Sequence, residues 1–313
     1  MKAPNPWIPG ILRPEFTWPQ QMGSTISERT PVTPHLPSLT TRRFWGFFHG
    51  LLERFSRAYS AYFSITFNSA VMDLPFGLVL KCSERVSVEE YLSMQMARAA
   101  GMPVPKALCC GYRKSLGYTS ILMTRLPGFE LSNSYDTLDV EGEDPWLEEL
   151  GRCLRAMRMW KSPFGEERIC SVAGTSISSQ RVPRHQMGPV ENERELHEYL
   201  LSAASDHAFP SREEYQKTMT LAREILDMPH RVVFTHGDFK AHNILIDDDG
   251  HLSAFLDWES AGWCPEYWEF ATAMRFGRDS WWYQVASVLG GDQYMEELKR
   301  DVALNRLTVD SYI

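Results

Sequence analysis

A helical stripe of large apolar side chains is the clearest pattern in the first third of the chain. Apolar residues recur there at spacings of three and four: Phe44, Phe47, Phe48, Leu51, Leu52 and Phe55. This spacing places them on one face of an α-helix. Ser38 or Thr40 can cap the helix. We expect the stripe to pack on a neighbouring sheet, since the other face is too weakly basic for a membrane-surface helix.

Strand-like alternation follows over residues 58–81 and ends in an apolar run closed by Lys81. Ser87 then caps a predicted helix over residues 88–100. Glu89 shares the inward face of that helix, where a carboxylate requires a cation, so we expect it to pair with Lys81. Glu90 is the alternative partner, but it belongs to a different face of the predicted helix.

The chain divides best near residue 127. Two further strands are predicted over 107–112 and 119–125, and Pro127-Gly128 then interrupts the pattern. Five strands and one key helix are expected before this break, and mostly helices after it. We therefore expect a proline-rich arm over residues 1–38, an N-lobe over 39–126 and a C-lobe over 127–313.

Residues 231–257 concentrate the polar groups that suggest chemistry. A strand leads to Asp238, Asn243 follows, and a predicted hairpin over residues 244–256 returns the chain to Asp257. Phosphoryl transfer needs a carboxylate near the attacking hydroxyl, oxygen ligands for Mg²⁺ and a cation for the nucleotide phosphates. Asp238, Asn243, Asp257 and Lys81 supply these groups.

Composition excludes several other functions. The formal net charge is -8 and the chain has no basic run, which argues against a nucleic-acid partner. The six cysteines form no CxxC pair, so we expect reduced thiols and a cytoplasmic protein without a zinc site. No run approaches the roughly 20 apolar residues that span a bilayer, so no membrane association is expected.

The sequence HGDFKAHNIL, followed by LDWE, resembles the aminoglycoside phosphotransferase / choline kinase-like family. The resemblance extends over about residues 70–275. LVLK looks like the family's small lobe, ILMTRLPG its hinge, and DWESAGWCPEYWEF a segment typical of fungal members. It implies an α+β, protein-kinase-like fold with a small antiparallel-sheet N-lobe, one key helix, and a larger, mainly helical C-lobe.

The resemblance also implies roles for individual residues. Asp238 would be the catalytic base, and Asn243 and Asp257 the magnesium ligands. Lys81, held by Glu89, would bind the ATP phosphates. The adenine pocket would be formed by the remaining nucleotide-binding residues: Met123 at the back, the backbones of Thr124 and Leu126, and the apolar floor of Leu245 and Leu256. His236 is expected to brace the catalytic loop.

The sequence departs from the family pattern at three points. Residues 66–70, the only candidate phosphate loop, contain no glycine. Glu259 follows Asp257 closely, which makes it a further candidate carboxylate near the metal. Lys240 lies two residues after Asp238, where it either stabilises the transferred phosphoryl group or is an ordinary loop lysine.

The expected activity is ATP- and Mg²⁺-dependent transfer of a phosphoryl group to an alcohol group of a small molecule. A protein serine/threonine kinase, suggested by Lys240, and a nucleotide-binding pseudokinase or scaffold are the alternatives. Acidic residues would suit an amine-bearing acceptor, or simply form a solvated surface: Asp136, Asp139, Glu141, Glu191 and Glu193. Four aromatic residues could wall its pocket or pack as core: Trp258, Trp263, Tyr267 and Trp268.

Overall fold

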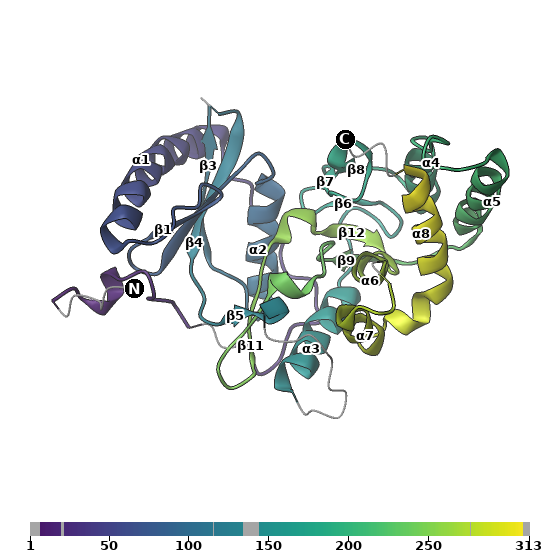
Figure 1. The fold of residues 1–313 in the computed structure, drawn as a ribbon. Helices are drawn as coiled ribbons and strands as arrows, with labels where there is room; N and C mark the ends of the chain where they lie inside the picture. Colours follow the sequence, from purple (N-terminus) through teal and green to yellow (C-terminus); the bar gives the residue numbers. More distant parts are fainter. Residues whose placement is uncertain (1–6, 20–21, 115, 134–143, 276, 309–313) are drawn as a thin grey trace.

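The protein folds into two lobes of unequal size, which Figure 1 shows side by side. The computed structural model describes residues 7–19, 22–114, 116–133, 144–275 and 277–308. The small lobe is built from α1 (Leu39–Phe63), β1 (Val71–Leu74), β2 (Leu78–Cys82), α2 (Val88–Ala99), β3 (Ala107–Arg113) and β4 (Tyr118–Thr124). Its strands form an antiparallel sheet in the order β1-β2-β4-β3.

The two helices of the small lobe cover opposite faces of this sheet. Helix α1 lies on the outer face, and α2 lies between the sheet and the large lobe (Figure 1). Successive side chains of a strand point to opposite faces. In β2, Leu80 therefore joins the apolar cluster on the α1 side, while its neighbour Lys81 points to the α2 side and the large lobe.

Helix α1 packs on the sheet as expected, but mainly through a neighbouring face that buries Gly46, His49 and Ser56. The aromatic residues of the predicted stripe face solvent, with Phe44, Phe47 and Phe55 exposed by 56%, 66% and 49%, whereas Leu52 packs against the apolar cluster of the sheet. The expectation that the stripe packs on the sheet was therefore wrong for its aromatic residues. A Cβ added to Gly46 would lie 2.0 Å from the Tyr112 carbonyl oxygen, so helix and strand approach too closely for large side chains.

The strand predicted over residues 58–70 is also absent from the structure. Helix α1 continues to Phe63, because Tyr59 stacks on Phe55 and contacts Phe63 at helical spacing. Ser64 ends the helix in the left-handed conformation, with φ 56°. Residues 65–70 then form a loop, so the small-lobe sheet has four strands rather than five.

The large lobe combines helices with short strands. Its helices are α3 (Pro145–Met159), α4 (Glu193–Leu201), α5 (Arg212–Arg223), α6 (Trp268–Met274), α7 (Trp281–Val288) and α8 (Met295–Thr308). Its strands are β5 (Phe129–Glu130), β6 (Cys170–Ser171), β7 (Ile177–Ser178), β8 (Gln186–Met187), β9 (Val232–Thr235), β10 (Ile244–Ile246), β11 (Leu252–Phe255) and β12 (Gly262–Pro265). The predicted hairpin is confirmed as β10 and β11, which pair antiparallel.

The N-terminal arm lies along both lobes. The Trp18 amide donates to the Arg125 carbonyl over 2.9 Å, and its indole donates to the Phe76 carbonyl over 2.7 Å. Further along, the Trp160 indole of the large lobe donates to the Ser27 carbonyl over 2.8 Å. Among the described residues, no helix combines the length and apolarity that a bilayer span requires.

Candidate functional site

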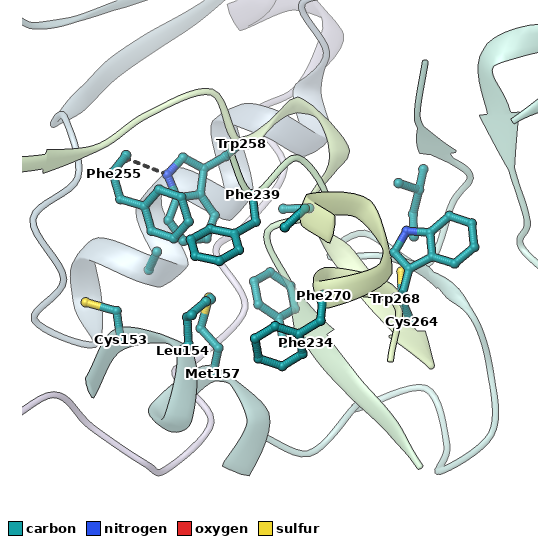
Figure 2. Packing of buried hydrophobic residues seen from close by; sticks show 14 of the residues in the cluster. Cys153, Leu154, Met157, Phe234, Phe239, Phe255, Trp258, Cys264, Trp268 and Phe270 are labelled. Atoms are coloured by element: carbon teal, nitrogen blue, oxygen red, sulfur yellow. Dashed lines mark hydrogen bonds between the residues drawn. The ribbon is translucent and has the colours of Figure 1, made fainter. Parts of the chain in front are cut away.

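The catalytic-loop sequence leaves the end of β9 and runs over a fully buried aromatic layer. Phe239, Phe255 and Trp258 form this layer, and the Trp258 indole donates to the Phe255 carbonyl over 2.9 Å (Figure 2). The Trp282 indole of α7 donates to the Phe239 carbonyl over 2.9 Å. These contacts fix the backbone on either side of Asp238 against the core of the large lobe.

His236 braces this loop, as expected. Its Nε2 lies 2.8 Å from the Leu256 carbonyl, its Nδ1 lies 3.3 Å from the Asp238 amide, and its ring stacks on Phe255. A neutral ring with the proton on Nε2 satisfies both contacts. Burial lowers the pKa of His236 to about 4, so the ring is neutral near pH 7 and joins the catalytic loop to the end of β11.

Glu269 of α6 holds the loop from the other side, a role that the sequence reasoning missed. It is only 3% exposed, and its carboxylate accepts from the His236 and Gly237 amides over 2.5 and 3.1 Å. A Cβ on Gly237 would lie 2.1 Å from the Ser260 carbonyl oxygen. Glycine is therefore required here, and a charged residue inside the apolar run of α6 was the available signal for Glu269.

Asp238, Lys240 and Asn243 lie together in the loop. Lys240 Nζ is 2.6 Å from Asp238 Oδ1, and Asn243 Nδ2 donates to Asp238 Oδ2 over 3.1 Å. Burial raises the pKa of Asp238, but the hydrogen bond and charge of Lys240 outweigh it and the pKa is lowered. Asp238 is therefore an ionised acceptor at neutral pH, with one oxygen held by a cation and the other by an amide.

The hairpin brings Asp257 back to this loop. The amide of Leu256, the residue before Asp257, donates to the Asn243 carbonyl over 2.8 Å. This hydrogen bond ties the end of the hairpin to the loop that carries Asn243. Asp257 itself adopts a left-handed backbone conformation, with φ 62°, which is uncommon for a residue other than glycine. Such strained residues concentrate at functional sites.

These residues fit a magnesium ion. Asn243 Nδ2 is directed at Asp238, so Oδ1 is the amide atom that can ligate a metal, and Asp257 adds a carboxylate. In the described ranges, no group of three or more His, Cys, Asp or Glu is arranged to hold a metal. Mg²⁺ retains several waters and needs only one or two carboxylates, so Asn243 and Asp257 are the residues that could hold it.

Lys81 joins the two lobes at this point. Its Nζ lies 2.5 Å from Asp257 Oδ1 and 2.6 Å from Glu90 Oε1. Burial lowers the pKa of Lys81, but the two carboxylates outweigh this effect and the pKa is raised, so the amine stays charged. Burial also raises the pKa of Glu90 to about 7.

The predicted pairing of Lys81 with Glu89 was wrong. Glu89 instead accepts from the Thr175 hydroxyl over 2.8 Å, and Glu90 holds the lysine. Helix α2 is covered on two sides, because it contacts both β3 and the segment after Asp257. Its apolar stripe therefore does not mark a single inward face. The buried small residues Ser93 and Ala97 line the face of Glu90.

The hinge residues lie in and after β4. Met123 is partly buried against the main core, and the Thr124 amide donates to the Lys106 carbonyl over 3.1 Å within the sheet. Leu126 is buried, whereas Leu245 and Leu256 are half-buried. No contact in the structure tests the adenine-binding role of these five residues, which stays a prediction.

A cavity of about 420 Å³ borders the hinge, and Trp18, Leu78 and Thr124 contribute to its lining. Leu78 packs with the apolar cluster on the α1 side of the sheet. Arg98 of α2 also lines it, so residues from both faces of the small-lobe sheet border this cavity.

Two of the acidic residues predicted to suit an amine-bearing acceptor, Glu191 and Glu193, lie in the described part of the chain and contact basic side chains there. Glu193 lies 2.7 Å from His230 Nδ1, and Glu191 lies 3.5 Å from Arg168 Nη1. Asp136, Asp139 and Glu141 lie outside the described residues. The aromatic residues pack as core rather than lining a pocket, since each is at most 2% exposed: Trp258, Trp263, Tyr267 and Trp268.

A second ion pair between the lobes lies next to the first. Arg85, in the loop between β2 and α2, places Nη2 2.6 Å from Oε1 of Glu259. The same nitrogen is 3.9 Å from Asp257 Oδ2. Glu259, which the sequence suggested as a further carboxylate near the metal, therefore contacts a cation in the structure.

Comparisons with known proteins agree on the fold. Three solved structures are similar: aminoglycoside phosphotransferase APH(4)-Ia (TM-score 0.51, 16% identity, 74% of this chain and 76% of that chain covered), a thermostable variant of it with ADP and hygromycin B (0.54, 12%, 80% and 88%), and the GDP and kanamycin complex of APH(2")-IIia (0.52, 16%, 77% and 80%). No curated protein is significantly similar to this chain in sequence. The likeness confirms the expected bilobal, protein-kinase-like α+β fold.

The sequence itself is assigned by a family model described as the phosphotransferase enzyme family. The model matches residues 84–299, which is more than half of the chain. The matched segment begins three residues after Lys81 and includes the catalytic loop, the β10–β11 hairpin and Asp257. On this match, the chain belongs to the phosphotransferase enzyme family.

Proposed function

We propose that the protein is a phosphotransferase that moves the γ-phosphoryl group of ATP to a hydroxyl group of a small molecule, with Mg²⁺ as cofactor. The observation that carries the proposal is the 2.5 Å contact between Lys81 of the small lobe and Asp257 of the large lobe. It brings a cation for the nucleotide phosphates and a carboxylate for the metal to one point between the lobes.

In this proposal the chain's own residues position the two substrates. Asp238 accepts a hydrogen bond from the acceptor hydroxyl and takes its proton, which its lowered pKa and its ionised state at neutral pH allow. Asn243 orients Asp238 through its 3.1 Å hydrogen bond. Asn243 and Asp257 would hold the magnesium ion, which supplies neutralising charge to the phosphate oxygens when bound. Lys81 would bind the α- and β-phosphates.

The acceptor is proposed to be a small molecule with a hydroxyl group, and amine-bearing compounds are the first ones to test. Solved relatives of similar fold have been crystallised with hygromycin B and with kanamycin. The same relatives carry ADP and GDP, so both ATP and GTP belong in the assay as phosphoryl donors.

A protein acceptor is the second candidate, and Lys240 favours it. Lys240 Nζ lies 2.6 Å from Asp238 Oδ1, where it can neutralise the phosphoryl group as it leaves the nucleotide. The position of this lysine resembles that in many protein serine/threonine kinases. Transfer to proteins but not to small hydroxyl compounds would replace the leading proposal.

Three further expectations remain proposals. The division into an arm over 1–38, an N-lobe over 39–126 and a C-lobe over 127–313 rests on sequence patterns. The fungal-type assignment rests on the segment from Asp257 to Phe270. A cytoplasmic location rests on the cysteines, all six of which are buried and unpaired.

The direct experiment is a screen for ADP formation that depends on an added hydroxyl compound. The panel contains aminoglycosides, choline-like amines, sugars and nucleosides, with ATP and Mg²⁺ in every reaction. We expect at least one compound to stimulate ADP release by the wild type and not by Asp238→Ala. Equal ADP release by both proteins would show that the activity does not come from this site.

A further inference from the structure

Arg85 lies at the edge of the proposed nucleotide site and approaches it from the small lobe. Its Nη2 is 2.6 Å from Glu259 Oε1, and its Nε donates to Glu259 Oε2 over 3.2 Å. Its Nη2 is also 3.9 Å from Asp257 Oδ2, while Lys81 contacts the other oxygen of the same carboxylate. Two small-lobe cations thus approach Asp257.

The loop that would otherwise contact the phosphates is engaged elsewhere. Residues 64–70 contain no glycine, so the backbone cannot readily fold around a phosphate group. The side-chain oxygen of Asn68 accepts from the Ala70 and Val71 amides over 2.8 and 3.3 Å. The Arg57 guanidinium carbon lies 4.3 Å from the centre of the Phe67 ring. Phe67 also packs against the apolar cluster on the α1 side of the sheet.

We propose that Arg85 binds the terminal phosphates of the nucleotide and so replaces the contacts of a glycine-rich loop. This inference rests on the proposed function. Phosphates bound by Lys81 would come within reach of the Arg85 guanidinium, which lies 3.9 Å from the Asp257 carboxylate that Lys81 also contacts. The planar fork of arginine can bind a phosphate through two hydrogen bonds at once.

The Arg85–Glu259 pair suits a cation that changes partner. The Arg85 side chain is 52% exposed, whereas Glu259 is 4% exposed and fixed in the large lobe. The guanidinium reaches solvent and can therefore turn toward an entering phosphate, which replaces the Glu259 carboxylate as its anionic partner. In the free protein, Glu259 keeps the guanidinium at the edge of the site, beside Asp257.

A purely structural role for Arg85 makes a different prediction. If the pair only held the lobes together, its loss would weaken all nucleotides alike, since every one of them would bind between the same two lobes. A phosphate-binding role instead affects ATP most and AMP least. The number of phosphates on the ligand therefore separates the two roles.

The test measures dissociation constants of ATP, ADP and AMP, each with Mg²⁺, for four full-length proteins. These are the wild type, Arg85→Ala, Arg85→Lys and the control Arg306→Ala. Arg306 matches Arg85 well, being 47% exposed and 2.6 Å from Glu214, but this pair joins α8 to α5 in the large lobe.

We expect Arg85→Ala to weaken ATP binding at least about tenfold and AMP binding less than about twofold. The ATP dissociation constant of Arg85→Lys should lie between those of Arg85→Ala and the wild type, because lysine keeps the charge but loses the planar guanidinium. Arg306→Ala should change none of the three constants. Equal weakening of all three nucleotides, or unchanged ATP binding, would overturn the role of Arg85. A wild type that binds no nucleotide would instead contradict the proposed function itself.

Discussion

At the scale of single residues, the sequence predicts which residues lie at the site better than it predicts which side chains they contact. Lys81 was expected at the centre of the phosphate site and does contact Asp257, yet its carboxylate partner is Glu90 rather than Glu89. Neighbouring residues of a helix differ by about 100° in direction. Which of the two glutamates faces Lys81 depends on which side of α2 packs most closely. Here the small buried residues Ser93 and Ala97 lie on the side of Glu90.

This difference gives the first prediction. Glu90→Gln should lower kcat/KM for phosphoryl transfer by about 10–100-fold, which is about 1.4–2.7 kcal/mol, because Lys81 loses a charged partner while Asp257 remains. The matched control is Glu89→Gln, which should stay within about twofold of the wild type. Steady-state kinetics of both variants test the assignment. A large loss in Glu89→Gln and none in Glu90→Gln would restore the original pairing.

Contacts between distant segments explain the residues that sequence reasoning missed. Glu269 meets the His236 amide across 33 positions and Arg85 meets Glu259 across 174. Neither pair follows from a local motif. A charged residue within an apolar helix predicts that the residue is buried, but it does not predict its hydrogen-bond partner. The residues of the catalytic loop and hairpin were predictable because their spacing within one segment is fixed.

At the scale of elements, hydrophobic spacing predicted that a helix exists but not which way it faces. Helix α1 exposes its aromatic stripe and buries Gly46 and His49 against the sheet. Glycines on both partners cause this, since a Cβ on Gly111 of β3 would lie 2.8 Å from the Gly46 nitrogen. The close backbone contact between α1 and β3 leaves no room for large side chains between them. Hydrophobic spacing along a helix gives no information about such contact.

The glycine contact predicts an unequal response along α1. Gly46→Ala should lower the free energy of unfolding by about 1–3 kcal/mol or more, because the added methyl meets a strand backbone that cannot turn aside. Gly50→Ala, one turn later, has its nearest atom 3.6 Å away and should raise stability by about 0.5–1 kcal/mol. Urea unfolding measures both. Equal effects would mean that α1 does not pack through Gly46.

A half-buried histidine, His230, joins α4 to α8 and makes their association depend on pH. His230 lies 2.7 Å from Glu193 and 3.1 Å from Glu297. Burial lowers the pKa of His230, but its hydrogen bonds to the two carboxylates outweigh it and the pKa is raised above 6.5. A raised histidine pKa stabilises the fold fully below pH 6.5, and this stabilisation is lost as the pH rises through the raised value.

We therefore expect His230→Gln to cost about 1–2 kcal/mol of unfolding free energy at pH 6 and clearly less at pH 9. Denaturant unfolding at the two pH values gives both differences. His251→Gln serves as the control, because His251 also lies near a carboxylate, Glu149 at 3.0 Å, but is exposed. A cost of His230→Gln that grows toward pH 9 would contradict the assigned charge state.

At the scale of the whole molecule, the bilobal fold was predictable because motifs from both lobes resemble one family. LVLK in the small lobe and HGDFKAHNIL in the catalytic segment imply the same protein-kinase-like fold, and the structure confirms it. The path of the N-terminal arm was not predictable, since it is fixed by single hydrogen bonds such as that of Trp18 to Arg125. The acceptor pocket was not predictable either, because the four aromatic residues that could line it or pack as core do pack as core.

The central claim is that this fold transfers a phosphoryl group through Asp238. The most direct test is the kcat for transfer from ATP to an acceptor, measured for the wild type and for Asp238→Asn together with the dissociation constant of ATP. The account predicts that kcat falls about 10²–10⁴-fold in the variant while ATP binding changes less than about threefold. An unchanged kcat in Asp238→Asn would contradict it.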